Sequence, residues 1–179
     1  MIRLLRILVL GAGFLVLATV AVGLFMPRSW SVECARTLRA PPERVQESLE
    51  DLGTWSIWTP WSKSRDPSLA VTFDGPPRGV GSRMSWEGQL LGFGSLTLVK
   101  ATPPHGIEYE LQFSGVDQIT RGSIALAPDP AGTRITWKDG GELGWNPLMR
   151  LFSPLFEAKL TQDFEAGLSR LAGIVEAPR

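Results

Sequence analysis

Apolar residues recur at helical spacing near the end of the chain, in residues 146–176. Beyond Pro154, where we expect a break, the recurring residues are Phe156, Leu160, Phe164, Leu168, Leu171 and Val175. Steps of three and four place these side chains on one face of an α-helix. A stripe of about six turns is longer than one neighbouring helix of ordinary length covers. We therefore expect a curved sheet to wrap this helix.

Period-two alternation upstream of this helix predicts short strands. The clearest alternation is in residues 107–113, where apolar and polar side chains exchange at every position. Further strands are expected at residues 30–39, 69–73, 82–87, 96–100, 121–127 and 133–138. Residues 128–132 indicate a tight reversal. Gly92 and Gly94 indicate a connection that lets a sheet bend, and Gly140-Gly141 indicates a flexible joint before the last helix.

A short helix is predicted over residues 43–52, because proline precedes it, Glu43 lies in its first turn and Gly53 ends it. The following segment, Trp55 to Trp61, holds three of the seven tryptophans. It is interpreted as a hydrophobic plug closing one end of the core. The alternatives are an aromatic lip at a ligand cavity and a surface resting on a bilayer.

These elements predict an α+β fold, with six or seven antiparallel strands, a short early helix and a long last helix. The strands have one polar face and no segment repeats itself. One domain over residues 29–179 accounts for all of them, preceded by a separate segment over residues 1–28.

The segment over residues 1–28 contains an uncharged apolar run, Ile7 to Met26, that is long enough to cross a bilayer. Arg3 and Arg6 precede the run, which by the positive-inside rule leaves the N-terminus in the cytoplasm. A cleaved signal peptide, with a cleavage site near 21–23, is the alternative. Both interpretations place the folded domain on the extracytoplasmic side, and the first makes the protein a single-pass membrane protein.

Charge and cysteine content exclude several classes of protein. The chain has 18 basic and 18 acidic residues, and without Arg3 and Arg6 the balance is 18 − 2 = 16 basic against 18 acidic. Nucleic-acid binding needs a clustered basic face, so we do not expect it. Cys34 is the only cysteine, which excludes an intrachain disulfide.

Few residues carry recognisable chemistry. Glu108 and Glu110 fall on the polar face of their strand, and the single histidine, His105, lies in a turn without partners for a zinc site. Gly92-Phe93-Gly94 lacks the third glycine of a dinucleotide site. We therefore expect neither a metal nor a cofactor. The polar residues that could point into a cavity are Arg83, Glu87, Asp139 and Glu142, with Arg83, Glu87 and Glu142 as the candidates for acid–base catalysis.

Several motifs resemble the START-like superfamily, which includes polyketide cyclases/dehydrases, lipid-transfer START domains and pollen-allergen-type proteins. The motifs that carry the resemblance are Ala40-Pro41-Pro42-Glu43-Arg44-Val45, Asp51-Leu52 before Trp55, Trp58-Thr59-Pro60-Trp61, Gly79-Val80-Gly81-Ser82, Trp86-Glu87-Gly88, Gly132-Thr133-Arg134-Ile135-Thr136-Trp137 and Asp163-Phe164-Glu165-Ala166-Gly167-Leu168. They are most similar to the polyketide cyclase/dehydrase branch with an N-terminal membrane segment. The resemblance implies a helix-grip fold, in which a bent antiparallel sheet grips the C-terminal helix around a hydrophobic cavity.

Three functions follow from this interpretation. The first is a membrane-anchored binding protein for a hydrophobic or lipid-like small molecule, with Gly167 leaving space against the helix. Its cavity would be lined by Met84, Trp86, Leu98, Tyr109, Leu111, Phe113, Ile124, Trp137, Phe164 and Leu168. The second is a cyclase or dehydratase that uses acid–base residues in the same cavity. The third is a non-catalytic envelope protein that engages a partner through its tryptophan cluster; no feature of the sequence identifies a protein partner.

Overall fold

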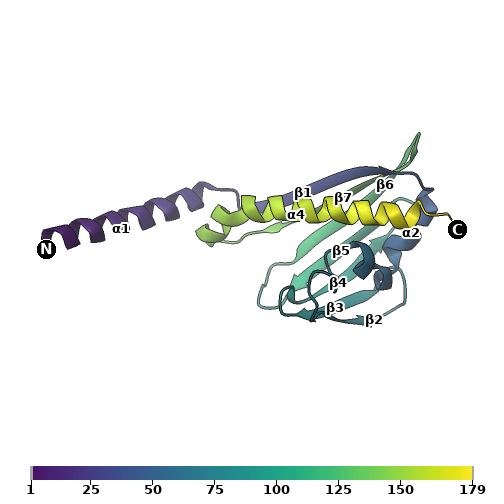
Figure 1. Ribbon diagram of the computed structural model, residues 1–179, viewed down its shortest axis with the longest axis horizontal. Helices are drawn as coiled ribbons and strands as arrows, with labels where there is room; N and C mark the ends of the chain where they lie inside the picture. Colours follow the sequence, from purple (N-terminus) through teal and green to yellow (C-terminus); the bar gives the residue numbers. More distant parts are fainter. Residues whose placement is uncertain (1, 179) are drawn as a thin grey trace.

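The structure is a computed structural model that describes residues 2–178. It is a helix-grip α+β fold, as the sequence predicts: one strongly bent antiparallel sheet with a long helix lying across its concave face (Figure 1). The strands are β1 (Ser29–Leu38), β2 (Ala70–Asp74), β3 (Arg83–Gly88), β4 (Gly92–Ala101), β5 (Gly106–Phe113), β6 (Thr120–Asp129) and β7 (Gly132–Glu142). Their order is β1-β7-β6-β5-β4-β3-β2, so the first strand of the chain pairs with the last.

The long helix α4 spans Pro147–Val175 and continues through Pro154, so the expected break there is wrong. Proline has no N–H to donate to the carbonyl four residues earlier, which is that of Arg150. The Ser153 hydroxyl donates to that carbonyl instead, at 3.0 Å, and this replacement is why the helix tolerates the proline. Asn146 caps the first turn by accepting a hydrogen bond from the Leu148 N–H at 3.0 Å.

The apolar stripe of α4 is covered along only half of its length. Phe164, Leu168, Leu171 and Val175 are buried against the sheet and α2. Phe156, on the same stripe, is 48% exposed, and Leu160 between them is half-buried. The N-terminal half of α4 therefore stands off from the sheet, and this gap decides where the cavity lies.

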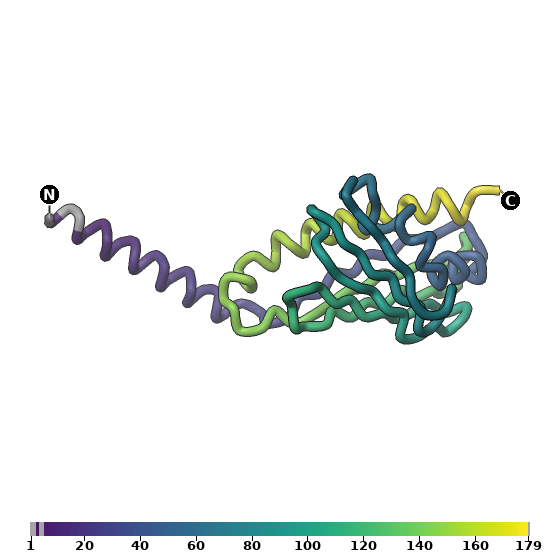
Figure 2. The backbone as a smooth tube through the Cα atoms, turned by 90° about the horizontal axis from the view of Figure 1, so that it is seen from below, coloured from purple at the N-terminus to yellow at the C-terminus, as the bar shows by residue number. Residues whose placement is uncertain are grey.

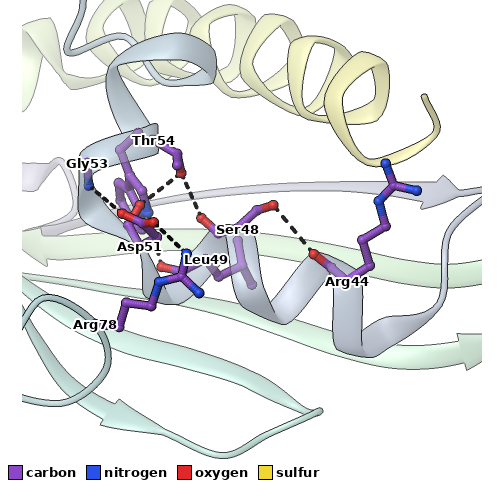
Figure 3. Close-up of polar contacts among 8 residues, drawn as sticks. Arg44, Ser48, Leu49, Asp51, Gly53, Thr54 and Arg78 are labelled. Carbon is purple, nitrogen blue, oxygen red and sulfur yellow. Dashed lines mark hydrogen bonds and ion pairs between the residues drawn. The ribbon is translucent and has the colours of Figure 1, made fainter. Parts of the chain in front are cut away.

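Hydrogen bonds fix the turn that carries the tryptophan segment (Figure 3). Helix α2 (Pro42–Glu50) is followed by a 3-10 turn, η1 (Leu52–Thr54), and a short helix, α3 (Trp55–Trp58). Asp51 accepts hydrogen bonds from the Gly53 N–H and from Arg78, at 3.1 and 2.9 Å, while the Trp55 indole donates to the Leu49 carbonyl at 3.0 Å. This arrangement turns the indole of Trp55 inward.

Trp55 and Trp58 are fully buried, which confirms that they plug the core. Trp61 is 8% exposed and lines the cavity described below, so the end of the segment also forms an aromatic wall. All three indoles are thus buried. The segment does not form the exposed patch that the third hypothesis requires.

Two glycine segments behave differently from expectation because both are paired within the sheet. Gly92 and Gly94 belong to β4, where a Cβ on Gly94 would lie 2.9 Å from the Gln112 carbonyl oxygen. Gly140 and Gly141 belong to β7 and pair with Ser31 and Trp30 of β1. Pairing with a neighbouring strand removes the freedom that glycine gives an isolated backbone. Gly140 and Gly141 are therefore not a flexible joint.

Helix α1 spans Ile2–Phe25 and projects away from the domain, as both views show (Figures 1 and 2). Its C-terminal end contacts the start of α4: Gly23 lies against Pro147, and the Arg150 guanidinium donates to the Leu24 carbonyl at 3.4 Å. Residues Arg6–Phe25 form a helix long and apolar enough to cross a membrane. The end of α1 is thus tied to the part of α4 that stands off from the sheet.

Candidate ligand-binding cavity

A cavity of about 780 Å³ lies between the N-terminal half of α4 and the sheet, and it opens to solvent. This volume is within the range of about 300–1,000 Å³ that small-molecule sites occupy. The sheet contributes Trp30, Leu111, Phe113, Thr120, Asp139 and Glu142; the loops contribute Pro60, Trp61, Arg65, Leu91, residues 115–118 and residues 143–146; and α4 contributes Met149, Phe152, Ser153, Phe156, Lys159, Leu160 and Asp163. Most of the wall is apolar or aromatic, with charged groups confined to a few positions.

Of the ten residues expected to line a cavity, Leu111 and Phe113 do so. The other eight lie in the packed core: Met84, Trp86, Leu98, Tyr109, Ile124, Trp137, Phe164 and Leu168. The reason is close helix packing, since the rings of Trp137 and Phe164 stack at 3.9 Å with an interplanar angle of 8°. Gly167 permits this approach, because a Cβ there would lie 3.0 Å from the Trp137 ring. The space expected at Gly167 is therefore filled by protein.

The three catalytic candidates do not meet. Arg83 and Glu87 are exposed, and Arg83 donates to the Ser95 hydroxyl at 3.1 Å beside a shallow depression of about 320 Å³ outside the main cavity. Only Glu142 reaches the main cavity, at its exposed rim. Strand alternation explains Arg83 and Glu87, because their neighbours Met84 and Trp86 occupy the inward face.

The polar group at the buried end of the cavity is Asp139, which is 2% exposed. The Tyr109 hydroxyl donates to Asp139 Oδ1 at 2.5 Å, and the Trp137 indole Nε1–H donates to the same hydroxyl at 2.6 Å. Gly122, between the two on β6, makes room for them, since a Cβ there would collide with the Tyr109 ring and with Oδ1. Strands β5 and β7 thus share one ordered chain of hydrogen bonds, and Gly122 of β6 leaves the space for it.

Burial controls the electrostatics of this group. Loss of solvent raises the pKa of Asp139 to about 7, while the adjacent Tyr109 hydroxyl and Trp137 N–H act in the opposite direction. Burial, together with the neighbouring carboxylate, raises the pKa of Tyr109 well above its usual value. Asp139 therefore changes charge near neutral pH, and Tyr109 stays protonated. A carboxyl group with these properties in a cavity can bind a hydrogen-bond donor or exchange a proton.

The sequence carries one signal for Asp139, the alternation of β7. Alternation along β7 places Thr133, Ile135 and Trp137 inward, and Asp139 is the next position of that series. A carboxylate that continues an apolar face must be paired or must lie in a cavity. Its partner could not be identified, because Tyr109 lies thirty residues earlier in the chain.

Other charges gather at the rim of the cavity. Asp163 forms ion pairs with Arg65 at 2.5 Å and with Lys159 at 3.1 Å. Asp117 and Glu142 also line the cavity, and no described residue forms an ion pair with either. Glu108 and Glu110 lie away from the cavity and pair with Lys100 and Arg121. Within residues 2–178, no three His, Cys, Asp or Glu side chains are placed to hold a metal ion.

Comparison with known proteins identifies the family. The profile of the family described as "Polyketide cyclase / dehydrase and lipid transport" matches residues 29–176. The chain belongs to this family. The family match confirms the START-like superfamily that the motifs suggest. No curated protein matches the chain.

Solved structures show the same fold at low sequence identity. Protein SA2116 from Staphylococcus aureus is 12% identical, with a TM-score of 0.64 over 83% of this chain and 94% of its own. Protein CV1439 from Chromobacterium violaceum is 20% identical, with a TM-score of 0.61 over 83% of this chain and 99% of its own. Ara h 8.0201 is 13% identical, with a TM-score of 0.59 over 84% and 99%. These similarities concern the fold alone.

Proposed function

We propose that this member of the family is a membrane-anchored binding protein that holds a hydrophobic or lipid-like small molecule between the sheet and α4. The observation that carries the proposal is the cavity of about 780 Å³, whose walls are largely apolar and aromatic. Such walls favour an apolar molecule, because burying its surface contributes about 25 cal/mol per Å². The aromatic part of the wall is formed by Trp30, Trp61, Phe113, Trp145, Phe152 and Phe156.

The anchor in this proposal is α1, which crosses the membrane once with the folded domain on the extracytoplasmic side. Only 6% of the apolar stretch of α1 is buried, which distinguishes α1 from the core helix of a globular domain. Its C-terminal end is fixed to α4 through Arg150 and Pro147, so the start of α4 lies next to the membrane surface. The cavity mouth would then open close to the lipid headgroups.

Exposed apolar side chains support this orientation. Trp145 and Phe152, which line the cavity, are 73% and 58% exposed, and Leu155, one turn beyond Phe152 on α4, is 71% exposed. Arg28 stacks over the Trp145 ring, with its Cζ 4.0 Å from the ring centroid. Tryptophan and arginine are suited to the boundary between lipid and water. We propose that this exposed apolar surface, Trp145, Phe152 and Leu155, touches the bilayer.

A nitroxide label tests the membrane contact. Phe152→Cys, labelled in the full chain in nanodiscs, should give a spin label that relaxes faster with oxygen than with a water-soluble nickel chelate, because oxygen concentrates in lipid. Gln162→Cys, on the exposed side of α4 farther along, is the matched control and should show the reverse. Equal accessibility to the nickel chelate at both positions would refute the contact. Cys34 is buried and should take up little label.

Filling the cavity should abolish binding. The double variant Thr120→Trp/Leu160→Trp places an indole on the sheet wall and another on the helix wall. We expect the amount of apolar ligand retained to fall by at least about tenfold, because the volume that buries the ligand is lost. Native mass spectrometry of the full chain released from detergent micelles measures the bound mass.

The matched control, Ala125→Trp/Gln162→Trp, adds the same two indoles at exposed positions of β6 and α4. It should retain the ligand as the unmodified chain does. A wild-type chain that carries no small molecule and binds none of a panel of apolar compounds would remove the basis of the proposal.

Acid–base catalysis of the cyclase or dehydratase type is the second candidate function. Asp139 favours it, because a carboxyl with a pKa raised to about 7 can both donate and accept a proton near neutral pH. In that case the molecules extracted from wild-type and Asp139→Asn proteins should differ by the mass of water or by a ring closure. Identical extracts from the two proteins favour binding alone.

A further inference from the structure

The ordered hydrogen bonds around Asp139 determine which chemistry it presents to the cavity. The Tyr109 oxygen accepts from the Trp137 N–H, so the Tyr109 proton is directed at Asp139 Oδ1. No described residue donates a hydrogen bond to Oδ2. Among the described residues, Trp58 Nε1 is the one fully buried side-chain polar atom without a hydrogen-bond partner. Oδ2 also lacks a partner but is not fully buried, so it is accessible from the cavity that Asp139 lines. A free carboxylate oxygen, deep in an apolar pocket, requires a hydrogen-bond donor.

The other charged groups that line the cavity support the same conclusion. Both basic side chains, Arg65 and Lys159, are engaged by Asp163. Asp117, Asp139 and Glu142 have no basic partner, so the lining carries a surplus of negative charge. An anionic head group, such as a carboxylate or a phosphate, would be repelled in this cavity, whereas a donor or a cation would be attracted.

We infer that the cavity selects apolar molecules whose head group donates a hydrogen bond, a hydroxyl or a protonated amine, and that Asp139 Oδ2 accepts it. The inference rests on the proposed binding function and names its ligand class. In the bound state the head group reaches the buried end beside Asp139 and Leu111, and the apolar tail extends toward Trp145 and Phe152 at the mouth. Fatty acids and phospholipids with a net negative head group are disfavoured, because the unpaired carboxylates of the lining repel them.

Photolabelling of the full chain in nanodiscs tests this selection. The probes are dodecanol, dodecylamine and dodecanoic acid, each carrying a diazirine next to the head group. Mass spectrometry measures how much probe is attached to the peptides that line the cavity. This amount is divided by the labelling of α1, because that ratio corrects for differences in how much of each probe enters the bilayer. We expect the alcohol and the amine to label β5 and β7 at least about tenfold more than the acid, the ratio that a charge-assisted hydrogen bond provides.

Two amide variants distinguish a specific role of Asp139 from a general effect of negative charge in the cavity. Asp139→Asn keeps an oxygen for the Tyr109 hydroxyl but turns an amide donor toward the cavity, so the preference for the alcohol and the amine should disappear or reverse. Glu142→Gln removes the same charge at the rim and should change the ratio by less than about twofold. A probe with its diazirine at the tail should label the residues at the mouth, which gives a readout independent of any variant.

The outcomes are distinguishable. Equal labelling of the cavity by all three probes overturns the inference and leaves the binding function standing. Preferential labelling by the acid also overturns it. Labelling of α1 without labelling of the cavity by any probe overturns both the inference and the binding function.

Discussion

Trp137→Ala is expected to lower the free energy of unfolding by about 4 kcal/mol, the usual cost of removing a large buried aromatic side chain. Trp137 is fully buried, stacks on Phe164 and lies edge-on to Trp58 at 5.4 Å. It also donates to the Tyr109 hydroxyl. The substitution thus removes packing between sheet and helix together with a buried hydrogen bond. Urea unfolding of the full chain in detergent micelles, followed by circular dichroism, measures the loss.

Trp145→Ala is the matched control for this experiment. Trp145 is 73% exposed, so its loss should cost less than about 1 kcal/mol, mainly from its contact with Arg28. Similar losses from the two substitutions would contradict the packed core between β7 and α4. They would instead indicate that the cavity extends to Trp137.

The stability of the protein is expected to fall as the pH rises from about 4 to about 7, because of Asp139. The pKa of Asp139 is raised in the folded protein from 3.8 to about 7. Between these values the folded chain holds a proton that the unfolded chain has lost, so raising the pH favours unfolding. A pKa shift of this size lowers the free energy of unfolding by as much as about 4 kcal/mol, and the full loss is reached above the folded-state pKa of Asp139.

Asp139→Asn isolates this effect because the amide does not titrate and still accepts from Tyr109. Urea unfolding of both proteins at about pH 4.5, 6 and 7.5 should show the variant gaining stability relative to the wild type as the pH rises. Asp66, whose pKa is lowered to about 2, titrates below this window. Parallel stability curves would contradict the raised pKa of Asp139 and weaken both the catalytic candidate and the ligand preference.

Local periodicity determined most of the fold. The alternation in β5 and β6 and the stripe on α4 depend on neighbouring residues, and the order of elements limits how a sheet can cover a long helix. Two expectations were wrong, one because of pairing between distant strands and one because of a side-chain hydrogen bond within a single helical turn. Strand pairing made Gly140 and Gly141 part of β7, and the Ser153 hydroxyl allowed α4 to pass through Pro154.

The site depended on tertiary structure almost entirely. Phe156 and Phe164 belong to one stripe and are equivalent by period, yet only Phe164 is covered, because the sheet and the tryptophan plug meet α4 at its C-terminal half. The sequence also indicates that Asp139 faces inward. Only the fold brings it to Tyr109 across Gly122, and burial of that pair changes the proton affinity of Asp139. Periodicity thus determined which side chains face inward, and three-dimensional packing decided which of them border empty space.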